Sequence, residues 1–191
     1  MQPLIQFLQR SGQFTEPQIN QIRSGVISRT LQKGEHFAGP GSPALEIGFV
    51  LKGILRAFSN IPEGQESTLY FIDENNFALA GGSESIQAVM RTELAILSCQ
   101  DLQSSSFTIV DWDKLANLIT VRTRMDKAEQ MSPTLAGDAT ARYRMFMEKY
   151  PQIAGRVPLG FLASYLAITQ QSLSRIRKQL TRKSPPRENQ H

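Results

Sequence analysis

The stretch that decides the fold is LGFLASYLAITQQSLSRIRKQL, residues 159–180. Its apolar positions recur three or four residues apart on either side of a short break, as two amphipathic helices require. These positions are Leu162, Leu166, Ile168, Leu173 and Ile176. Thr169 follows the break, where its hydroxyl can accept an N–H that the helix leaves unpaired. The pattern predicts two short helices joined by a turn, with Thr169 capping the second.

The outward face of the second predicted helix carries polar and basic side chains. They are Gln170, Gln171, Ser174, Arg175 and Lys178. Gln can bind the edge of adenine and Arg the edge of guanine, each through two hydrogen bonds. Ala163 is small where the helices would cross. An ordinary amphipathic helix pair with a solvated face is the alternative, but the joint pattern favours a helix-turn-helix whose second helix enters the DNA major groove.

LASYLAITQQSLSRIRKQL also resembles the C-terminal motif of Crp/Fnr-type transcription regulators, whose short members read LASYLGITPETLSRIRKKL. The match runs nearly residue for residue. Ala167 replaces the family's usual glycine, at a cost of about 1–2 kcal/mol if the turn needs positive φ. The Gln170-Gln171 pair also departs from the family, which changes the DNA sequence expected to be read but not the mode of reading.

This resemblance implies roles for individual residues of the second helix. Gln170, Gln171 and Arg175 match the family's base-reading positions. Phosphate contacts are expected from Thr169, Ser174, Arg177 and Lys178. Longer members carry a two-stranded wing after this helix, and we expect none in this chain. The tail from Lys183 to His191 contains Pro185-Pro186 and is expected to be disordered.

Charge is distributed unevenly along the 191 residues. Residues 131–191 hold ten Lys/Arg against three Asp/Glu, a net charge of +7, whereas the whole chain carries +4. Such asymmetry indicates a polyanionic partner for the C-terminal part, with a solubilising basic tail as the alternative. The single Cys99 excludes an internal disulfide, and there is no apolar run of membrane-spanning length and no secretory signal. We therefore expect a cytoplasmic protein without membrane partners.

Residues 26–107 read as an antiparallel β domain, because short apolar runs are separated by glycine-containing turns. A sandwich or a small barrel suits strands of this length. Three segments are similar to the Crp/Fnr sensor domain in the same order: KGEHFAGPG to KGEYLLREGE, IGFVLKGILRAF to LYFIEKGLVRLY, and PEGQESTLYF to DDGKEITLWF. The resemblance implies an α+β chain: a jelly-roll β domain, a long helix and a helix-turn-helix domain.

The expected boundaries are 1–110 for the β-roll sensor domain with its N-terminal helices, 111–131 for a linking helix, and 132–191 for the DNA-binding domain. Thr15 should cap a helix that buries Ile19 and Ile22. In the linking helix a short heptad seam comprises Leu118, Val121, Met125 and Ala128. In the family this helix joins two subunits, whereas packing on its own domain is the alternative. Ser132-Pro133 is expected to form the hinge.

Residues with catalytic or metal-binding chemistry are few. With only His36 and His191 the chain lacks the ligand set of a metal-binding β-barrel, and one cysteine cannot hold an iron–sulfur cluster. No nucleotide-binding or nucleophile motif is present. We therefore expect a non-enzyme without a cofactor or a metal ion.

Residues 80–92 correspond to the effector-binding segment of the resembled family. Family members that bind cAMP carry a GE-L segment that ends in R-S/T-A, with Glu on the ribose and Arg on the cyclic phosphate. Arg91-Thr92 resembles the second element, but Ala80-Gly81-Gly82 stands where GEL would be, and the spacing of Glu84 is wrong. We expect no cAMP binding in this mode. Arg91, Thr92, Gly81 and Gly82 are the candidate pocket for another small molecule.

The sequence thus predicts a sequence-specific, DNA-binding transcription regulator that acts as a homodimer, with an unidentified small-molecule effector left open. A small-molecule-binding β-roll protein, whose helix-turn-helix contacts other proteins, is the alternative. The charge of residues 131–191 favours the regulator.

Overall fold

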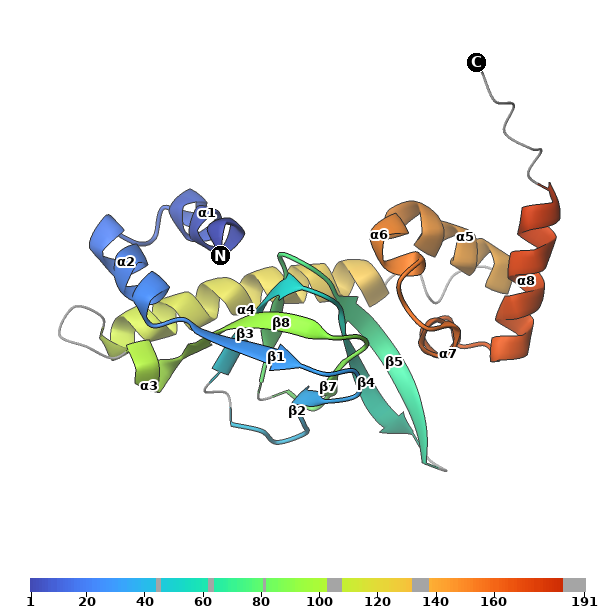
Figure 1. Cartoon of the computed structure of the whole chain (residues 1–191), viewed down its shortest axis with the longest axis horizontal. Helices are drawn as coiled ribbons and strands as arrows, with labels where there is room; N and C mark the ends of the chain where they lie inside the picture. The colour runs from blue at the N-terminus through green and yellow to red at the C-terminus, as the bar shows by residue number, and fades with distance from the viewer. Residues whose placement is uncertain (44–45, 62–63, 81, 103–107, 132–137, 184–191) are drawn as a thin grey trace, which may run out of the picture. The chain divides into compact units, whose positions relative to one another are not determined.

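The computed structural model describes residues 1–43, 46–61, 64–80, 82–102, 108–131 and 138–183. The chain divides into two compact units, Met1–Met131 and Ser132–His191 (Figure 1). The expected hinge at Ser132-Pro133 and the proline-containing tail after Lys183 lie outside the described residues.

In chain order the first unit contains α1 (Gln2–Ser11), α2 (Glu16–Ser24), β1 (Ile27–Leu31), β2 (His36–Ala38), β3 (Glu46–Lys52), β4 (Leu55–Ile61), β5 (Gln65–Ile72), β6 (Phe77–Leu79), β7 (Ser85–Ala88), β8 (Thr92–Ser98), α3 (Cys99–Leu102) and α4 (Ile109–Met131). Its strands form two antiparallel sheets, in the orders β1-β8-β3-β6 and β2-β7-β4-β5. This confirms the antiparallel β domain predicted from the turn spacing.

Alternation along the strands explains why the first unit has two apolar clusters. Successive side chains of a strand point to opposite faces of its sheet. On β8, Ala95 and Leu97 face the helices, whereas Leu94 and Ile96 face the second sheet. On β3, Ile47 and Phe49 likewise belong to the cluster beneath the helices. The sheet β1-β8-β3-β6 is therefore apolar on both faces, and it needs helices on one side and a second sheet on the other.

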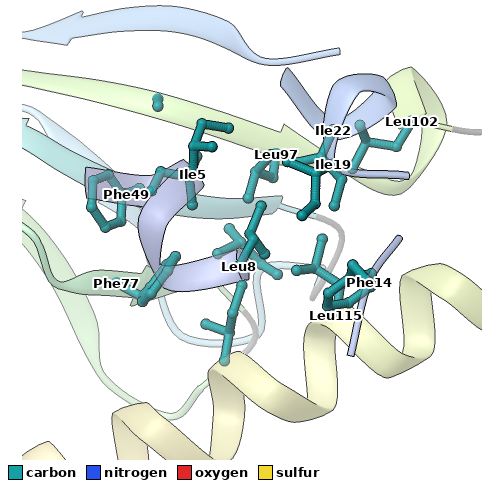
Figure 2. Packing of buried hydrophobic residues seen from close by; sticks show 14 of the residues in the cluster. Ile5, Leu8, Phe14, Ile19, Ile22, Phe49, Phe77, Leu97, Leu102 and Leu115 are labelled. Carbon is teal, nitrogen blue, oxygen red and sulfur yellow. The ribbon is translucent and has the colours of Figure 1, made fainter. Parts of the chain in front are cut away.

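Helices α1, α2 and α4 cover the outer face of this sheet. Figure 2 shows side chains of α1 and α2 converging on the strand residues Phe49, Phe77 and Leu97 and on Leu115 of α4. Ile19 and Ile22 of α2 are buried, and the Gln18 side chain accepts a hydrogen bond from the Thr15 N–H (2.9 Å). These contacts confirm the predicted second helix and anchor the N-terminal segment to the β domain.

The turn between β3 and β4 depends on Gly53. Its φ is +106°, and a Cβ there would lie 2.5 Å from Thr92 Oγ1 and 2.7 Å from Thr92 Cα. Thr92 is buried and donates its hydroxyl to the carbonyl oxygens of Ile54 and Met90. Only glycine fits both the backbone conformation and this close approach.

The second unit contains α5 (Ala139–Lys149), α6 (Pro151–Ala154), α7 (Leu159–Tyr165) and α8 (Gln170–Lys183). Asp138 caps α5, because its carboxylate accepts the N–H of Ala141 (2.8 Å). The sequence predicted the two helices of residues 159–180, whereas the single turn of α6 was not foreseen.

Candidate nucleic-acid interface

Helices α7 and α8 form the predicted helix-turn-helix. Of its five apolar positions, four are buried, and Ile168 in the turn is half-buried: Leu162, Leu166, Leu173 and Ile176 are the buried ones. The Thr169 hydroxyl accepts the N–H of Ser172 (3.1 Å), so the predicted N-cap of α8 is confirmed. Ala167 has a φ of +53°, the left-handed conformation that the glycine of the resembled motif would adopt freely.

Backbone hydrogen bonds fix the turn between the helices. The N–H of Ala167 donates to the carbonyl of Ser164 (3.1 Å), and the N–H of Ile168 donates to that of Ala163 (3.0 Å). Ala163 is itself buried, as expected for the small residue at the helix crossing. The two hydrogen bonds set the direction in which α8 leaves the turn.

The polar side chains of α8 lie together as the sequence indicated. One open groove is lined by Gln170, Gln171, Ser174, Arg175 and Lys178. All except Ser174, which is partly buried, are exposed. Two amides and two cations on one solvent-facing helix surface match the donors and acceptors of base edges and phosphates. The groove is therefore our candidate DNA-contacting surface.

Arg177 lies apart from this groove. Its Nε donates to the Tyr143 hydroxyl (3.1 Å), so the side chain is directed at α5. Arg142 of the same helix donates from Nη2 to the Leu166 carbonyl at the end of α7 (3.1 Å). Helix α5 thus contacts both helices of the motif: Arg142 of α5 bonds to the end of α7, and Arg177 of α8 bonds to Tyr143 of α5. No local pattern indicates these contacts, because the partners are 24 and 34 positions apart in the sequence.

An aromatic cluster supports the helix-turn-helix from α5. The ring of Phe146 lies 5.2 Å from that of Tyr165 and 5.5 Å from that of Tyr150, measured between centroids. Burial, together with the nearby Tyr150, raises the pKa of Tyr165 to about 12. Tyr165 therefore stays a neutral phenol throughout the physiological range. These rings pack α5 against the end of α7.

Helix α4 carries apolar side chains on two faces. The inner stripe packs on the β domain and consists of Trp112, Leu115, Ile119 and Thr123. The outer stripe is the predicted heptad seam: Leu118, Val121, Met125 and Ala128. Val121 is 60% and Met125 67% exposed, whereas Leu118 packs partly against the first unit's own core. At 3.6 residues per turn the stripes lie roughly half a turn apart.

The residues suggested for an effector pocket are not brought together. Arg91 follows the C-terminal end of β7, is 59% exposed at its side chain and pairs with Glu93 (2.6 Å). Gly82 precedes the N-terminal end of the same strand, and Thr92 is buried with its hydroxyl bonded to backbone. Gly81 lies outside the described residues.

Two polar clusters of the β domain were not foreseen. Arg56 of β4 is buried, lies 4.2 Å from the Phe58 ring centroid and bonds to Gln87 (2.7 and 3.0 Å) and Glu66. The only indication in the sequence that Arg56 is buried is its place within the apolar run ILRAF. Glu84 pairs with Lys127 of α4 (3.2 Å), which is 43 positions away, and no local sequence pattern indicates a contact over this separation.

Comparison with solved structures places this architecture among known ones. FixK2 from Bradyrhizobium japonicum superposes with a TM-score of 0.68 at 16% identity, over 83% of this chain and 85% of that chain. The c-di-GMP-responsive global regulator CLP of Xanthomonas campestris gives 0.64 at 17%, over 88% and 92%. A CRP-family transcriptional regulator from Thermus thermophilus gives 0.62 at 13%, over 81% and 85%.

These similarities confirm the predicted fold, a β-roll domain followed by a helix-turn-helix domain, as that of Crp/Fnr-type regulators. No family model and no curated protein matches the sequence. None of the helices in the described part of the chain has the length and apolarity needed to cross a membrane.

Proposed function

We propose that this chain is a sequence-specific, DNA-binding transcription regulator that works as a homodimer. The observation that carries the proposal is the groove on α8, where Gln170, Gln171, Arg175 and Lys178 face solvent from a capped helix packed on α7. The net charge of +7 over residues 131–191 supports a polyanionic partner. The resemblance to FixK2 and CLP extends to the fold, and their activity enters as analogy.

The residues of the groove divide by chemistry. Gln170, Gln171 and Arg175 can form paired hydrogen bonds with base edges in the major groove. Thr169, at the start of α8, and Ser174 and Lys178 supply single donors suited to phosphate oxygens. In this proposal Arg177 acts on DNA indirectly, because its bond to Tyr143 holds α8 on α5.

Selection of genomic DNA fragments by the purified protein tests the proposal. We expect enrichment of a short motif with two-fold symmetry, since a dimer places two recognition helices one helical turn apart. Replacing Arg175 by alanine should cost about 1–3 kcal/mol per half-site and relax the preference at one base pair. Lys178→Ala should weaken all DNA alike and reduce the salt slope by roughly one per contact.

Arg23→Ala is the matched control, because it removes one exposed positive charge from α2 in the first unit. It should change neither affinity nor sequence preference. If Arg175→Ala weakens binding to the selected DNA and to a random sequence by the same factor, Arg175 contacts phosphates and not bases. If no genomic fragment is enriched, the protein-contact alternative for the helix-turn-helix takes precedence.

The outer stripe of α4 supports the homodimer. A helix with apolar residues on two opposite faces needs two apolar partners, and the β domain covers the inner stripe and part of Leu118 but leaves Val121 and Met125 exposed. A second α4 has the same periodicity, so two outer stripes can pack side by side as a short coiled coil. The geometry favours Val121 and Met125 as the central contacts, since Leu118 is partly used by its own domain.

Sedimentation analysis tests the dimer. Joint replacement of Val121 and Met125 by glutamate should give monomers at micromolar concentration, because four carboxylates would have to be buried together. Ile61→Glu is the control, since it adds a carboxylate at another exposed apolar position, on β4. A wild-type chain that sediments as a monomer at this concentration would contradict the proposal.

A further inference from the structure

The C-terminal third of α4 is attached to the β domain differently from the rest of the helix. The inner stripe ends at Thr123, and no side chain described between 124 and 129 is buried. Beyond Thr123, Lys127 connects the helix to the β domain through polar and cation–π contacts. This third of the helix carries Met125 of the outer stripe and leads in the chain directly to the second unit.

Lys127 contacts two residues of the β domain at once. Its ammonium lies 3.2 Å from the Glu84 carboxylate, in the connection between β6 and β7, and 4.8 Å from the ring centroid of Tyr70 on β5. Tyr70 is only 3% exposed, and the side chains of Lys127 and Glu84 are 28% and 21% exposed. An ion pair sheltered to this degree is screened less by salt than a fully exposed one.

The charge states at neutral pH suit this arrangement. Burial acts to lower the pKa of Lys127, but the hydrogen bond with Tyr70 and the charge of Glu84 outweigh it, so the pKa is raised overall. Burial raises the pKa of Tyr70, which therefore remains a neutral phenol. Lys127 is thus a cation held between two partners, the carboxylate of Glu84 and the phenol ring of Tyr70, which is a favourable setting for an ammonium group.

Gly82 makes room for the carboxylate. A Cβ at this position would lie 2.4 Å from Glu84 Oε2, closer than a real contact allows. Because Glu84 Oε2 is the end of a flexible side chain, a larger residue at position 82 would require the Glu84 side chain to shift.

We propose that Lys127 is a positioning residue for DNA binding: its contacts with Glu84 and Tyr70 fix the C-terminal third of α4 on the β domain and make DNA binding independent of a small-molecule effector. The inference rests on the proposed function. A ligand that orders α4 would have to supply contacts between the β domain and this helix segment, and the chain already supplies them from its own side chains.

Lys127→Met tests the tether, because methionine keeps most of the apolar stem and removes the charge. Hydrogen exchange measured without DNA should speed up in residues 124–130. Binding to the selected DNA should weaken by about 2- to 30-fold. Glu84→Gln should act in the same direction. The double variant with Glu84→Lys and Lys127→Glu should recover part of both losses, which a general loss of stability would not do.

Lys114→Met is the matched control on the same helix. Lys114 donates to the Gln13 carbonyl (3.2 Å) near the N-terminal end of α4, so its loss removes equal charge but leaves residues 124–130 attached. Exchange in those residues and DNA affinity should both stay at wild-type values.

Two results would overturn the inference. The first is unchanged hydrogen exchange of residues 124–130 in Lys127→Met, since the contacts of Lys127 with Glu84 and Tyr70 would then not stabilise this helix segment. The second is a native mass spectrum of the protein–DNA complex that contains a small molecule in addition to two chains and the duplex. Failure of wild-type protein to bind any DNA would instead refute the proposed function, and the exchange experiment would still decide the tether.

Discussion

Replacing Ala167 by glycine should stabilise the helix-turn-helix. Ala167 has a φ of +53°, a conformation in which its methyl group strains the backbone. Its side chain is exposed. A non-glycine residue in this conformation costs about 1–2 kcal/mol. The greater conformational freedom of glycine in the unfolded chain lowers the stability by about 0.4–1 kcal/mol, which offsets part of this gain. The difference leaves a net gain of roughly 0.5–1 kcal/mol.

Hydrogen exchange is the appropriate assay, because the two units need not unfold together. Protection of the slowest amides in α7 and α8 should rise by about two- to fivefold, which corresponds to the expected gain. The fluorescence of the single tryptophan, Trp112 in α4, should show an unchanged unfolding transition, since it reports on the first unit. The hydrogen bonds that shape the turn involve backbone only, so DNA affinity should stay within about twofold of wild type.

Ala163→Gly is the matched control, with the same chemical change four positions earlier. Ala163 is buried in the helical part of the motif, so glycine there should cost about 1 kcal/mol or more from helix propensity and lost packing. Opposite signs for the two variants are the expected result. Reduced protection in Ala167→Gly would show that the turn is not strained at this residue, and the argument from φ would be wrong.

Three further predictions concern single residues. The pKa of Tyr165 is about 12 in the folded protein and about 10 in the unfolded chain, so its contribution to stability is complete below pH 10 and disappears as the pH rises toward 12. Tyr165→Phe should therefore reduce the loss of stability at alkaline pH, measured by unfolding curves followed by circular dichroism. Thr169→Ala should cost about 0.5–2 kcal/mol in urea unfolding, because the N–H of Ser172 loses its acceptor, whereas Thr169→Ser should retain the cap. Gly53→Ala should cost about 2–6 kcal/mol in the unfolding transition of the first unit, since backbone strain adds to the clash with Thr92.

The helix-turn-helix was predictable because its determinants are local. The apolar spacing, the cap at Thr169 and the turn at Ala167 all lie within a few residues of one another, and each has a short-range physical cause. The outer face of α8 follows from the same periodicity. Thus the residues that line the candidate DNA-contacting groove could be named from the sequence, whereas the expected phosphate contact Arg177 is directed at Tyr143 of α5.

The contacts of the β domain could not be predicted, because they depend on strand register. Arg91 and Gly82 are close in sequence, yet they lie beyond opposite ends of the strand β7, whose four residues are extended between them. Arg56 gave no sign of its partners, because Glu66 and Gln87 reach it from the two strands that flank β4. A shift of one residue in either pairing would move these side chains to the other face.

The sequence of α4 by itself permits two interpretations, and the structure confirms one of them and leaves two residues of the other pattern exposed. A seam at 118, 121, 125 and 128 predicts a partner helix, whereas Trp112, Leu115 and Ile119 have the spacing of a helix packed on its own domain. The β domain satisfies the second pattern and leaves Val121 and Met125 exposed. A helix with a single apolar face would have all of its apolar residues buried by these contacts, whereas α4 has a second apolar face that stays exposed. Exposed apolar residues at regular helical spacing on the face opposite the core are better explained by a second copy than by solvent.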